Sequence, residues 1–312
     1  MNRFRNILFV SKGIEDETES LKQALSLASN NKAALKIMVI YPQLPGELKG
    51  YRGQWESHLE EGIKQTARSS YATLNRGELD IQLSVTIEGT TIPEVQIIRQ
   101  ILRGQHDLVI KSAELVAGGK GFKALDMELL RKCPCPLWLA RPIARSRDHI
   151  RIAVAIDPEG QEKTANDLAL NLLALAGSLA ATCSGELDIV SCWDCEYEGF
   201  LRNNPFGSIP EDKVFEAVIG IRQNHRQALD ALIDKADLNI KTQTHHLRGR
   251  PEAIIPEFVS HQKIDILVMG TVARTGIPGF IMGNTAENLI QELKCSLLAL
   301  KSAGFVSPIT AY

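Results

Sequence analysis

The chain repeats itself once, and this repeat constrains the fold more than any other feature of the sequence. Asp107 and Asp265 lie in similar apolar segments and are 158 positions apart (265 − 107). Cys135 and Cys295 precede two further apolar segments and are 160 positions apart (295 − 135). A spacing that holds across several landmarks in a chain of 312 residues indicates two copies of one domain, not a solenoid of short repeats.

The boundary between the copies is predicted in residues 141–148, a basic segment that is poor in large apolar side chains. We therefore expect a first domain at residues 1–144 and a second at residues 149–312. Each is close to the usual size of a single domain.

Apolar strand-like runs alternate with helix-like segments in both copies. A run such as Ile266-Leu267-Val268-Met269 is apolar at every position, which is typical of a strand buried on both faces. Alternation of such strands with helices predicts an α/β fold with a parallel, doubly wound sheet of five strands in each copy. The expected strands are residues 6–11, 35–40, 81–87, 107–111 and 136–140, then 151–156, 186–191, 240–247, 264–269 and 296–300. The expected helices are residues 17–30, 54–75, 92–103 and 125–133, then 162–181, 211–236, 251–261 and 285–294.

The loop after the strand at 264–269 carries the most informative motif. Gly270 begins it, Gly283 ends it, and Thr285 lies where the next helix starts. A glycine-containing loop at a helix start presents backbone N–H groups and the positive end of the helix dipole to an anion. The segment resembles the nucleotide loop of the universal stress protein family, which reads Gly, two residues, Gly, nine residues, Gly, then Ser or Thr. The resemblance covers nearly the whole chain and implies an adenine nucleotide alpha hydrolase-like fold in each copy.

The motif departs from the family pattern at two positions. Ala273 stands in place of the middle glycine, and Asn284 stands in place of the Ser or Thr. The methyl group of Ala273 narrows the approach of the backbone to phosphates, while Asn284 can cap the following helix. The resemblance therefore implies a degenerate ATP-type site in the second copy, with no metal apart from the Mg²⁺ that accompanies a nucleotide.

Two further residues are assigned to this site because of the resemblance. Asp157 follows the first strand of the second copy, where the family's aspartate helps to hold the adenosine part of the ligand; alternatively it only starts a turn before Pro158. Arg274 either reaches a phosphate or is a solvated loop arginine. The complete set of predicted ligand-binding residues is Asp157, Met269, Gly270, Ala273, Arg274, Gly283, Asn284 and Thr285.

The first copy lacks this signature. Lys12 replaces the aspartate after the first strand, and Lys123 stands opposite Gly283. Residues 118–121 read Gly-Gly-Lys-Gly, but they are displaced from the family's position and are interpreted as a surface turn, not a phosphate cradle. We expect that the first copy does not bind ATP in the family manner.

Cys192 and Cys195 form the main rival signal, because a Cys-x-x-Cys pair can be a redox dithiol or half of a zinc site. The flanking residues 193–210 are expected to be a loop, and zinc needs about two more ligands. We assign no metal site and keep this pair as an alternative. The thiols of Cys133 and Cys135 are expected to pack in the core.

The histidines offer little further chemistry. His245 and His246 are adjacent on a predicted strand, so they face opposite sides of the sheet and at most one of them contributes to a given site. His225 and His261 are expected on helices, facing solvent or paired. No spacing of Ser, His and Asp or of paired carboxylates indicates hydrolytic catalysis, so we expect no enzyme beyond a weak ATPase.

Charge and apolar patterning exclude several classes of function. Lys and Arg number 35 and Asp and Glu number 37, so the net charge of −2 gives no support to a nucleic-acid or membrane surface. No apolar run approaches transmembrane length, and the N-terminus lacks the core of a signal peptide. Six cysteines in so long a chain do not make a small disulfide scaffold. We expect a cytoplasmic protein with mostly reduced thiols.

Together these features predict a tandem universal stress protein. It would be a regulatory module of the stress response that binds a small-molecule ligand, with the degenerate ATP-type site in its second domain. The alternatives are a binder of a more apolar molecule in the same crevice, a thiol redox or metal protein, and a purely structural interaction protein. The family pairs domains through their last strands. We therefore expect residues 136–140 to pair with residues 296–300 in an intramolecular pseudo-dimer; homodimerisation stays open.

Overall fold

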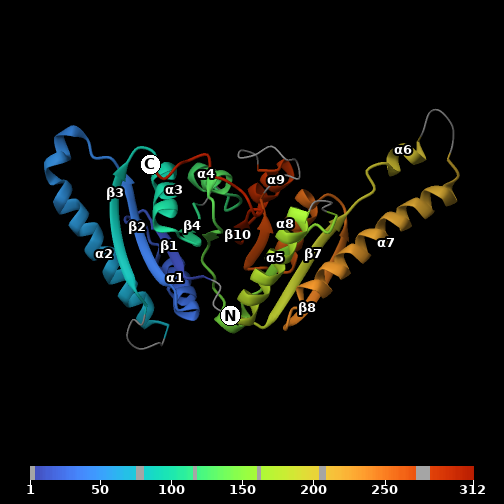
Figure 1. Ribbon diagram of the computed structural model, residues 1–312, viewed down its shortest axis with the longest axis horizontal. Coiled ribbons are helices and arrows are strands. Elements are labelled where there is room, and N and C mark those ends of the chain that lie inside the picture. The colour runs from blue at the N-terminus through green and yellow to red at the C-terminus, as the bar shows by residue number, and fades with distance from the viewer. Residues whose placement is uncertain (1–3, 75–80, 115–117, 160–162, 204–208, 272–281) are drawn as a thin grey trace.

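A computed structural model describes residues 4–74, 81–114, 118–159, 163–203, 209–271 and 282–312. These residues form one sheet of ten strands with helices on both faces (Figure 1). The first half contributes β1 (Asn6–Ser11), β2 (Ala34–Pro42), β3 (Leu83–Thr90), β4 (Leu108–Ser112) and β5 (Leu137–Ala140). The second half contributes β6 (Ile152–Ala155), β7 (Glu186–Trp193), β8 (Lys241–Arg248), β9 (Ile266–Gly270) and β10 (Ser296–Leu300).

The strand order is β3-β2-β1-β4-β5-β10-β9-β6-β7-β8. Neighbours within each half are parallel, which confirms the α/β fold with a five-stranded parallel sheet in each half. The two halves meet where β5 and β10 pair in antiparallel fashion, with Trp138 opposite Leu298. This is the strand pairing that the sequence predicted.

The long helices alternate with the strands as predicted. They are α1 (Thr18–Asn31), α2 (Arg52–Ala72), α3 (Pro93–Gly104), α4 (Ala124–Lys132), α5 (Lys163–Ala181), α7 (Glu211–Ala236), α8 (Pro251–His261) and α9 (Asn284–Glu292). Helices α3 and α8 each begin with a proline followed by a glutamate, because a first-turn proline sacrifices no hydrogen bond and the carboxylate suits the helix dipole. Two short 3₁₀ segments, η1 (Gly46–Tyr51) and η2 (Arg147–His149), complete the connections.

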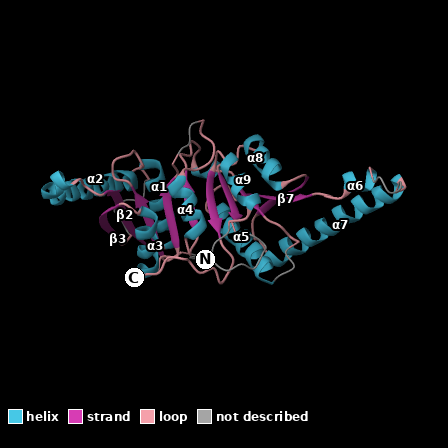
Figure 2. Ribbon diagram, turned by 90° about the horizontal axis from the view of Figure 1, so that it is seen from above, coloured by secondary structure: helices cyan, strands magenta, loops and turns pink. Residues whose placement is uncertain are grey.

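Alternate residues of each strand pack on opposite faces of the sheet. Ile7 and Phe9 of β1 join a core that includes residues of α1, α2, α5 and α7, whereas Leu8 and Val10 join a core that includes residues of α3, α4, α8 and α9. Both cores run through the two halves without interruption, since each contains residues of β5 and β10. The molecule is elongated along the sheet, with α2 and α7 at opposite ends (Figure 2).

The expected loop at residues 193–210 was wrong in two places. Strand β7 continues to Trp193, and a short helix, α6 (Glu198–Arg202), follows it. Arg202 donates hydrogen bonds to Glu198 one turn earlier, and Leu201 packs against a small apolar cluster that includes Val214 of α7. These contacts order a segment whose sequence carries little helical periodicity.

Candidate ligand site

The second half has its candidate site where β6 and β9 end side by side. Ala155 of β6 pairs with Met269 of β9, so Asp157, just beyond β6, and Gly270, the last residue of β9, lie at the carboxyl ends of neighbouring strands. The chain leaves these two strands in opposite directions along the sheet, towards β7 and towards β10. This switch point is where open α/β sheets bind ligands.

The glycines of the loop have distinct local roles. A Cβ atom on Gly270 would lie 3.0 Å from Cδ2 of Leu168, so this glycine lets α5 pack closely against the end of β9. The N–H of Gly283 donates to the carbonyl of Thr271 at 3.3 Å, which joins the two ends of the loop. Met269, which precedes Gly270 in β9, is buried in the sheet.

The start of α9 corrects one expectation. Gly283, in an extended conformation, occupies the N-cap position, and none of the described side chains caps the helix. Asn284 is already the first helical residue, so its side chain cannot take the capping role predicted for it. Asn284 and Thr285 are both exposed in the first turn, where backbone N–H groups lack helical partners. Ala273 and Arg274 lie outside the described residues, and their roles stay predictions.

Asp157 makes the turn that the sequence allowed. Its Oδ1 accepts a hydrogen bond from the N–H of Glu159 at 3.0 Å, and the residue is exposed beside the end of β6. This contact confirms the turn-forming role. A contact of the same carboxylate with a ligand stays a prediction.

In the first half, charged side chains occupy the position that corresponds to this site. Lys111 of β4 pairs with Val10 of β1 and is only 2% exposed. Its Nζ lies 2.9 Å from Oδ1 of Asp126 and 3.0 Å from Oε1 of Glu114, and the Nζ of Lys12 lies 3.4 Å from the same Glu114 oxygen. We call Lys12, Lys111, Glu114 and Asp126 the charged cluster.

Burial and neighbouring charges act against each other in the charged cluster, and burial raises the pKa of Asp126 above its ordinary value. Burial alone would raise the pKa of Glu114, but the ammonium groups of Lys111 and Lys12 bring its pKa below the ordinary value. The N–H of Glu114 donates to Oδ2 of Asp126 at 2.7 Å, which satisfies the second oxygen of that buried carboxylate. The cluster therefore provides internally the charge partners that a ligand would otherwise supply.

The two halves differ at matched positions. Lys111 corresponds to Met269, because both are the fourth residue of their strands and both pair with the first strand of their half. Asp126 corresponds to Ala286, the third residue of α9. Lys123 caps α4 where Gly283 caps α9, as the sequence alignment of the halves predicted. Sequence reasoning missed the charged cluster, although a lysine opposite an apolar Met269 was a usable signal.

Residues 118–121 form a turn that docks on the other half. Gly118, Gly119 and Gly121 all have positive φ. The Arg141 guanidinium donates to the carbonyls of Gly119 and Gly121 at 2.7 and 2.5 Å, and the N–H of Gly121 donates to the carbonyl of Leu293 at 2.9 Å. The interpretation as a turn is confirmed, and the turn's main chain is committed to the junction between the halves.

The Cys192 and Cys195 pair lacks the setting of a reactive thiol. Cys192 lies within β7, and burial raises its pKa to about 12, so its thiol is protonated at neutral pH. Cys195 is buried in a separate small cluster beneath α6 and α7. Among the described residues, no group of three or more His, Cys, Asp or Glu side chains is placed to hold a metal ion.

The adjacent histidines face opposite sides of β8, as predicted. His245 lies 2.7 Å from Oδ1 of Asp188, whereas the Nε2 of His246 lies 2.9 Å from the Nδ1 of His225. His225 is a paired histidine on α7, and it is buried. The rings of Trp193, His246 and His225 stack in series.

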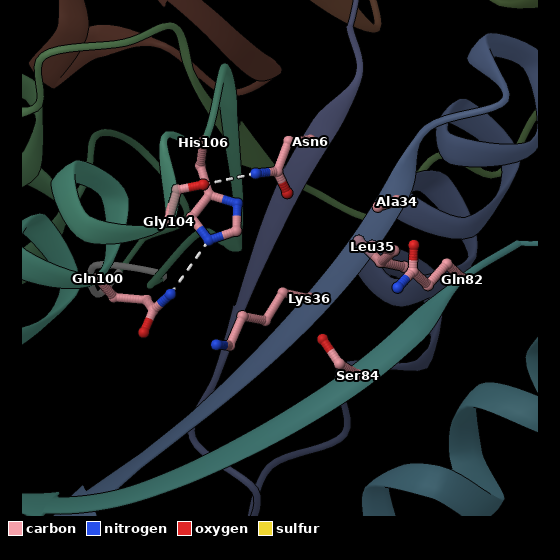
Figure 3. A pocket seen from close by; sticks show the side chains of 9 residues that line it. All are labelled: Asn6, Ala34, Leu35, Lys36, Gln82, Ser84, Gln100, Gly104 and His106. Carbon is pink, nitrogen blue, oxygen red and sulfur yellow. Dashed lines mark hydrogen bonds between the residues drawn. The ribbon is translucent and has the colours of Figure 1, made fainter.

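A polar pocket of about 230 Å³ lies at the opposite end of the sheet from the switch points (Figure 3). It is formed by the amino ends of β1, β2 and β3 and the carboxyl end of α3, and sequence reasoning missed it. Asn6 donates to the carbonyl of Gly104 at 2.6 Å, and Gln100 lies 3.2 Å from His106. Lys36 is the cation in its lining.

Comparison with known proteins finds a family match in the second half of the chain and relatives over its full length. The universal stress protein family model matches residues 150–301. Universal stress protein E from Photorhabdus laumondii is 28% identical over 100% of this chain and 99% of its own, and the protein of that name from Escherichia coli is 28% identical over 99% and 98%. None of the described helices is both long and apolar enough to cross a membrane.

Solved structures agree with the fold over the full length. A crystal structure of a functionally unknown protein from Pseudomonas aeruginosa has a TM-score of 0.72 at 20% identity and covers 96% of this chain and 94% of its own. That of a universal stress protein from Archaeoglobus fulgidus has a TM-score of 0.63 at 15% identity, with 96% and 99% coverage. The second half of the chain therefore carries a universal stress protein family domain, and the whole chain is similar to proteins named Universal stress protein E.

Proposed function

We propose that the chain is a tandem stress-response protein of the cytoplasm that binds one anionic ligand of the adenine nucleotide type and regulates by binding, not by turnover. Its domains are residues 1–144 and 149–312, joined through β5 and β10 as an intramolecular pseudo-dimer. The single observation that carries this proposal is the contrast between the halves. The charged cluster occupies the first switch point, while the second has Met269 and Ala286 at the matched positions.

The second half offers the groups that such a ligand needs. The first turn of α9 exposes Asn284 and Thr285 beside backbone N–H groups that have no partner within the helix, and such groups attract phosphate. Asp157 is placed across the switch point at the end of β6, where a carboxylate can accept hydrogen bonds from ribose hydroxyls. Mg²⁺ would arrive with the nucleotide. Ala273 and Arg274 complete the proposed set.

The test is a calorimetric titration of the full-length, ligand-stripped protein with ATP and Mg²⁺. We expect one site per chain, lost in Gly283→Val, because a β-branched side chain at the N-cap obstructs the first turn of α9. Lys123→Val is the matched control, since exposed Lys123 holds the same N-cap position in the first half. Two sites per chain, or loss of binding in Lys123→Val, would overturn the assignment of the site to the second half.

A second candidate is a more apolar ligand in the same crevice. Met269 and Met282 flank the two loop glycines, and both pack in the apolar core on that face of the sheet. Methionine adapts readily to apolar ligands. Native mass spectrometry of the protein as purified distinguishes the two candidates: a retained apolar molecule together with no ATP binding favours this one.

A further inference from the structure

Two cysteines lie in contact at the point where the halves join. Cys133 ends α4, Pro134 follows, and Cys135 precedes β5. The two sulfur atoms are 3.8 Å apart. Cys133 is fully buried, whereas Cys135 is partly exposed. The second half has no such pair, since Leu293 and Cys295 occupy the matched positions.

The second half supplies a cation to this pair. Ala299 of β10 pairs with Leu137 of β5, and continuing that antiparallel register brings Lys301 opposite Cys135. The Nζ of Lys301 donates to the carbonyl of Arg131 at 2.6 Å, which fixes the ammonium beside the end of α4. The other charged group acting on the pair is Asp107, at the start of β4.

This environment favours a thiolate on one sulfur. A hydrogen bond from Cys135 lowers the pKa of Cys133, and the Lys301 ammonium lowers it further. The same hydrogen bond raises the pKa of Cys135, so Cys133 is the first of the two thiols to lose its proton. Burial lowers the pKa of Lys301 to about 8, which still leaves most of this side chain protonated at pH 7.

We propose that Cys133 and Cys135 are a redox-active dithiol that closes to an intrachain disulfide by reaction with a low-molecular-weight disulfide. The inference does not depend on the ligand site of the second half. It requires the sulfur–sulfur distance to shorten from 3.8 Å to about 2.05 Å, a change within reach of side-chain rotation in two residues so close in sequence.

The reaction balances in two exchange steps. Starting from the dithiol, Cys133 loses its proton to solvent and then takes up the proton of Cys135 along the sulfur–sulfur hydrogen bond. The resulting Cys135 thiolate attacks one sulfur of the external disulfide R–S–S–R. The Cys135–S–S–R bond forms, the external bond breaks, and RS⁻ leaves and takes a proton from solvent. Cys133 then loses its proton to solvent and attacks the Cys135 sulfur, which expels the second RS⁻. The two cysteines lose two electrons and two protons, and R–S–S–R becomes two RSH.

The experiment treats the reduced full-length protein with oxidised glutathione and follows intact mass and tryptic peptides. In the wild-type protein we expect the peptide that begins at Cys133 to lose two hydrogen atoms, reversibly on addition of dithiothreitol. Cys133→Ser should stop at a glutathione adduct on Cys135. Cys135→Ser should lose the adduct altogether, because buried Cys133 is inaccessible to glutathione. Cys192→Ser is the matched control and should react as the wild type does.

Two results would overturn the proposal: a wild-type Cys133 peptide that stays reduced while glutathione reacts elsewhere, or oxidation of Cys192 and Cys195 in preference. A further variant tests the cation without removing a thiol. Lys301→Met should shift the pH profile of the exchange rate to higher pH, because the thiolate loses its ammonium neighbour. An unchanged profile would contradict the assigned role of Lys301.

Discussion

The Nζ of Lys111 lies 2.9 Å from Oδ1 of Asp126 at the switch point of the first half, and in the second half the same two positions hold Met269 and Ala286. One fold thus accommodates an ion pair and an apolar pair at equivalent places. Both partners of the ion pair are shielded from solvent, since Lys111 is 2% exposed and Asp126 is 0% exposed. In the first half, the charges at the switch point pair with one another, whereas in the second half we propose that a ligand binds there.

The second half supplies the substitutions that test this pair. Lys111→Met leaves the Asp126 carboxylate buried beside Glu114 without its cation, and should lower the free energy of unfolding by about 3–5 kcal/mol. Adding Asp126→Ala removes the stranded charge, so the double variant should be more stable than Lys111→Met. Urea unfolding of the wild type, the two single variants and the double variant measures these differences. Lys22→Met, which breaks an exposed pair with Glu19, should change stability by less than about 0.5 kcal/mol.

If the double variant lost as much stability as the two single losses added together, the charges would be acting independently and the cluster would not be a unit. The same double variant, titrated with ATP and Mg²⁺, shows whether emptying the first switch point of charge creates a second binding site. We expect none, because Lys123 and not a glycine holds the N-cap position of α4, and the glycine turn before it is engaged at the junction between the halves.

The sequence predicted the strands and the long helices, because these depend on local apolar patterns and on the repeat. The pairing of the two last strands was predicted from the family resemblance, and the structure adds that it is antiparallel. The cluster around Lys111 escaped prediction for a physical reason. Its members are brought together by the sheet, and Lys111 on its own is indistinguishable from a polar strand end. The docking of Gly121 on Leu293 escaped for the same reason, as these residues are far apart in sequence. The loop glycines were found, but their packing against Leu168 and Thr271 needed coordinates.

Arg141 should be a main support of the junction between the halves. Its buried guanidinium donates to the carbonyls of Gly119, Gly121 and Leu293 and lies over the ring of Phe122. Arg141→Met leaves three carbonyls without this donor and should lower the free energy of unfolding by about 3 kcal/mol. The midpoint of urea unfolding measures it.

Lys120→Ala is the control on the same turn, because the Lys120–Glu292 ion pair joins the same two halves but is exposed. We expect a change of less than about 0.5 kcal/mol. Equal losses in the two variants would mean that charge across the junction, and not the carbonyl contacts of Arg141, provides the support.

Gly121 should tolerate a methyl group less well than Gly118 does. Both have positive φ, so alanine costs about 1–2 kcal/mol of backbone strain at either position. A Cβ on Gly121 would also lie 2.7 Å from the carbonyl oxygen of Gln291, whereas one on Gly118 would meet nothing within 4 Å. Gly121→Ala should therefore lose roughly 1–2 kcal/mol more than Gly118→Ala in thermal or urea unfolding. Equal losses would show that the turn does not press on α9 in solution.

The His225–His246 pair should make stability depend on pH below neutrality. Burial, and then the neighbouring His225 and the arginines Arg226 and Arg222, lower the pKa of His246 to about 4. In the unfolded chain this histidine titrates near 6.5. Between these two pKa values the unfolded chain binds the proton more tightly than the folded protein does. The contribution of His246 to the free energy of unfolding is therefore complete above pH 6.5 and is lost as the pH falls towards 4. When the proton binds to the ring nitrogen that accepts the 2.9 Å hydrogen bond between His225 and His246, this hydrogen bond is lost as well.

His246→Gln isolates this contribution, because glutamine cannot take up the proton. From pH 7 to pH 4, the wild-type protein should lose about 2 kcal/mol more of its free energy of unfolding than the variant does. This value is smaller than the full effect of the pKa difference because the ring of His246 is partly exposed. Urea unfolding at several pH values gives both curves, and His261→Gln, at an exposed histidine on α8, should follow the wild type. Parallel curves for wild type and His246→Gln would mean that His246 is protonated as readily in the folded protein as in the unfolded chain.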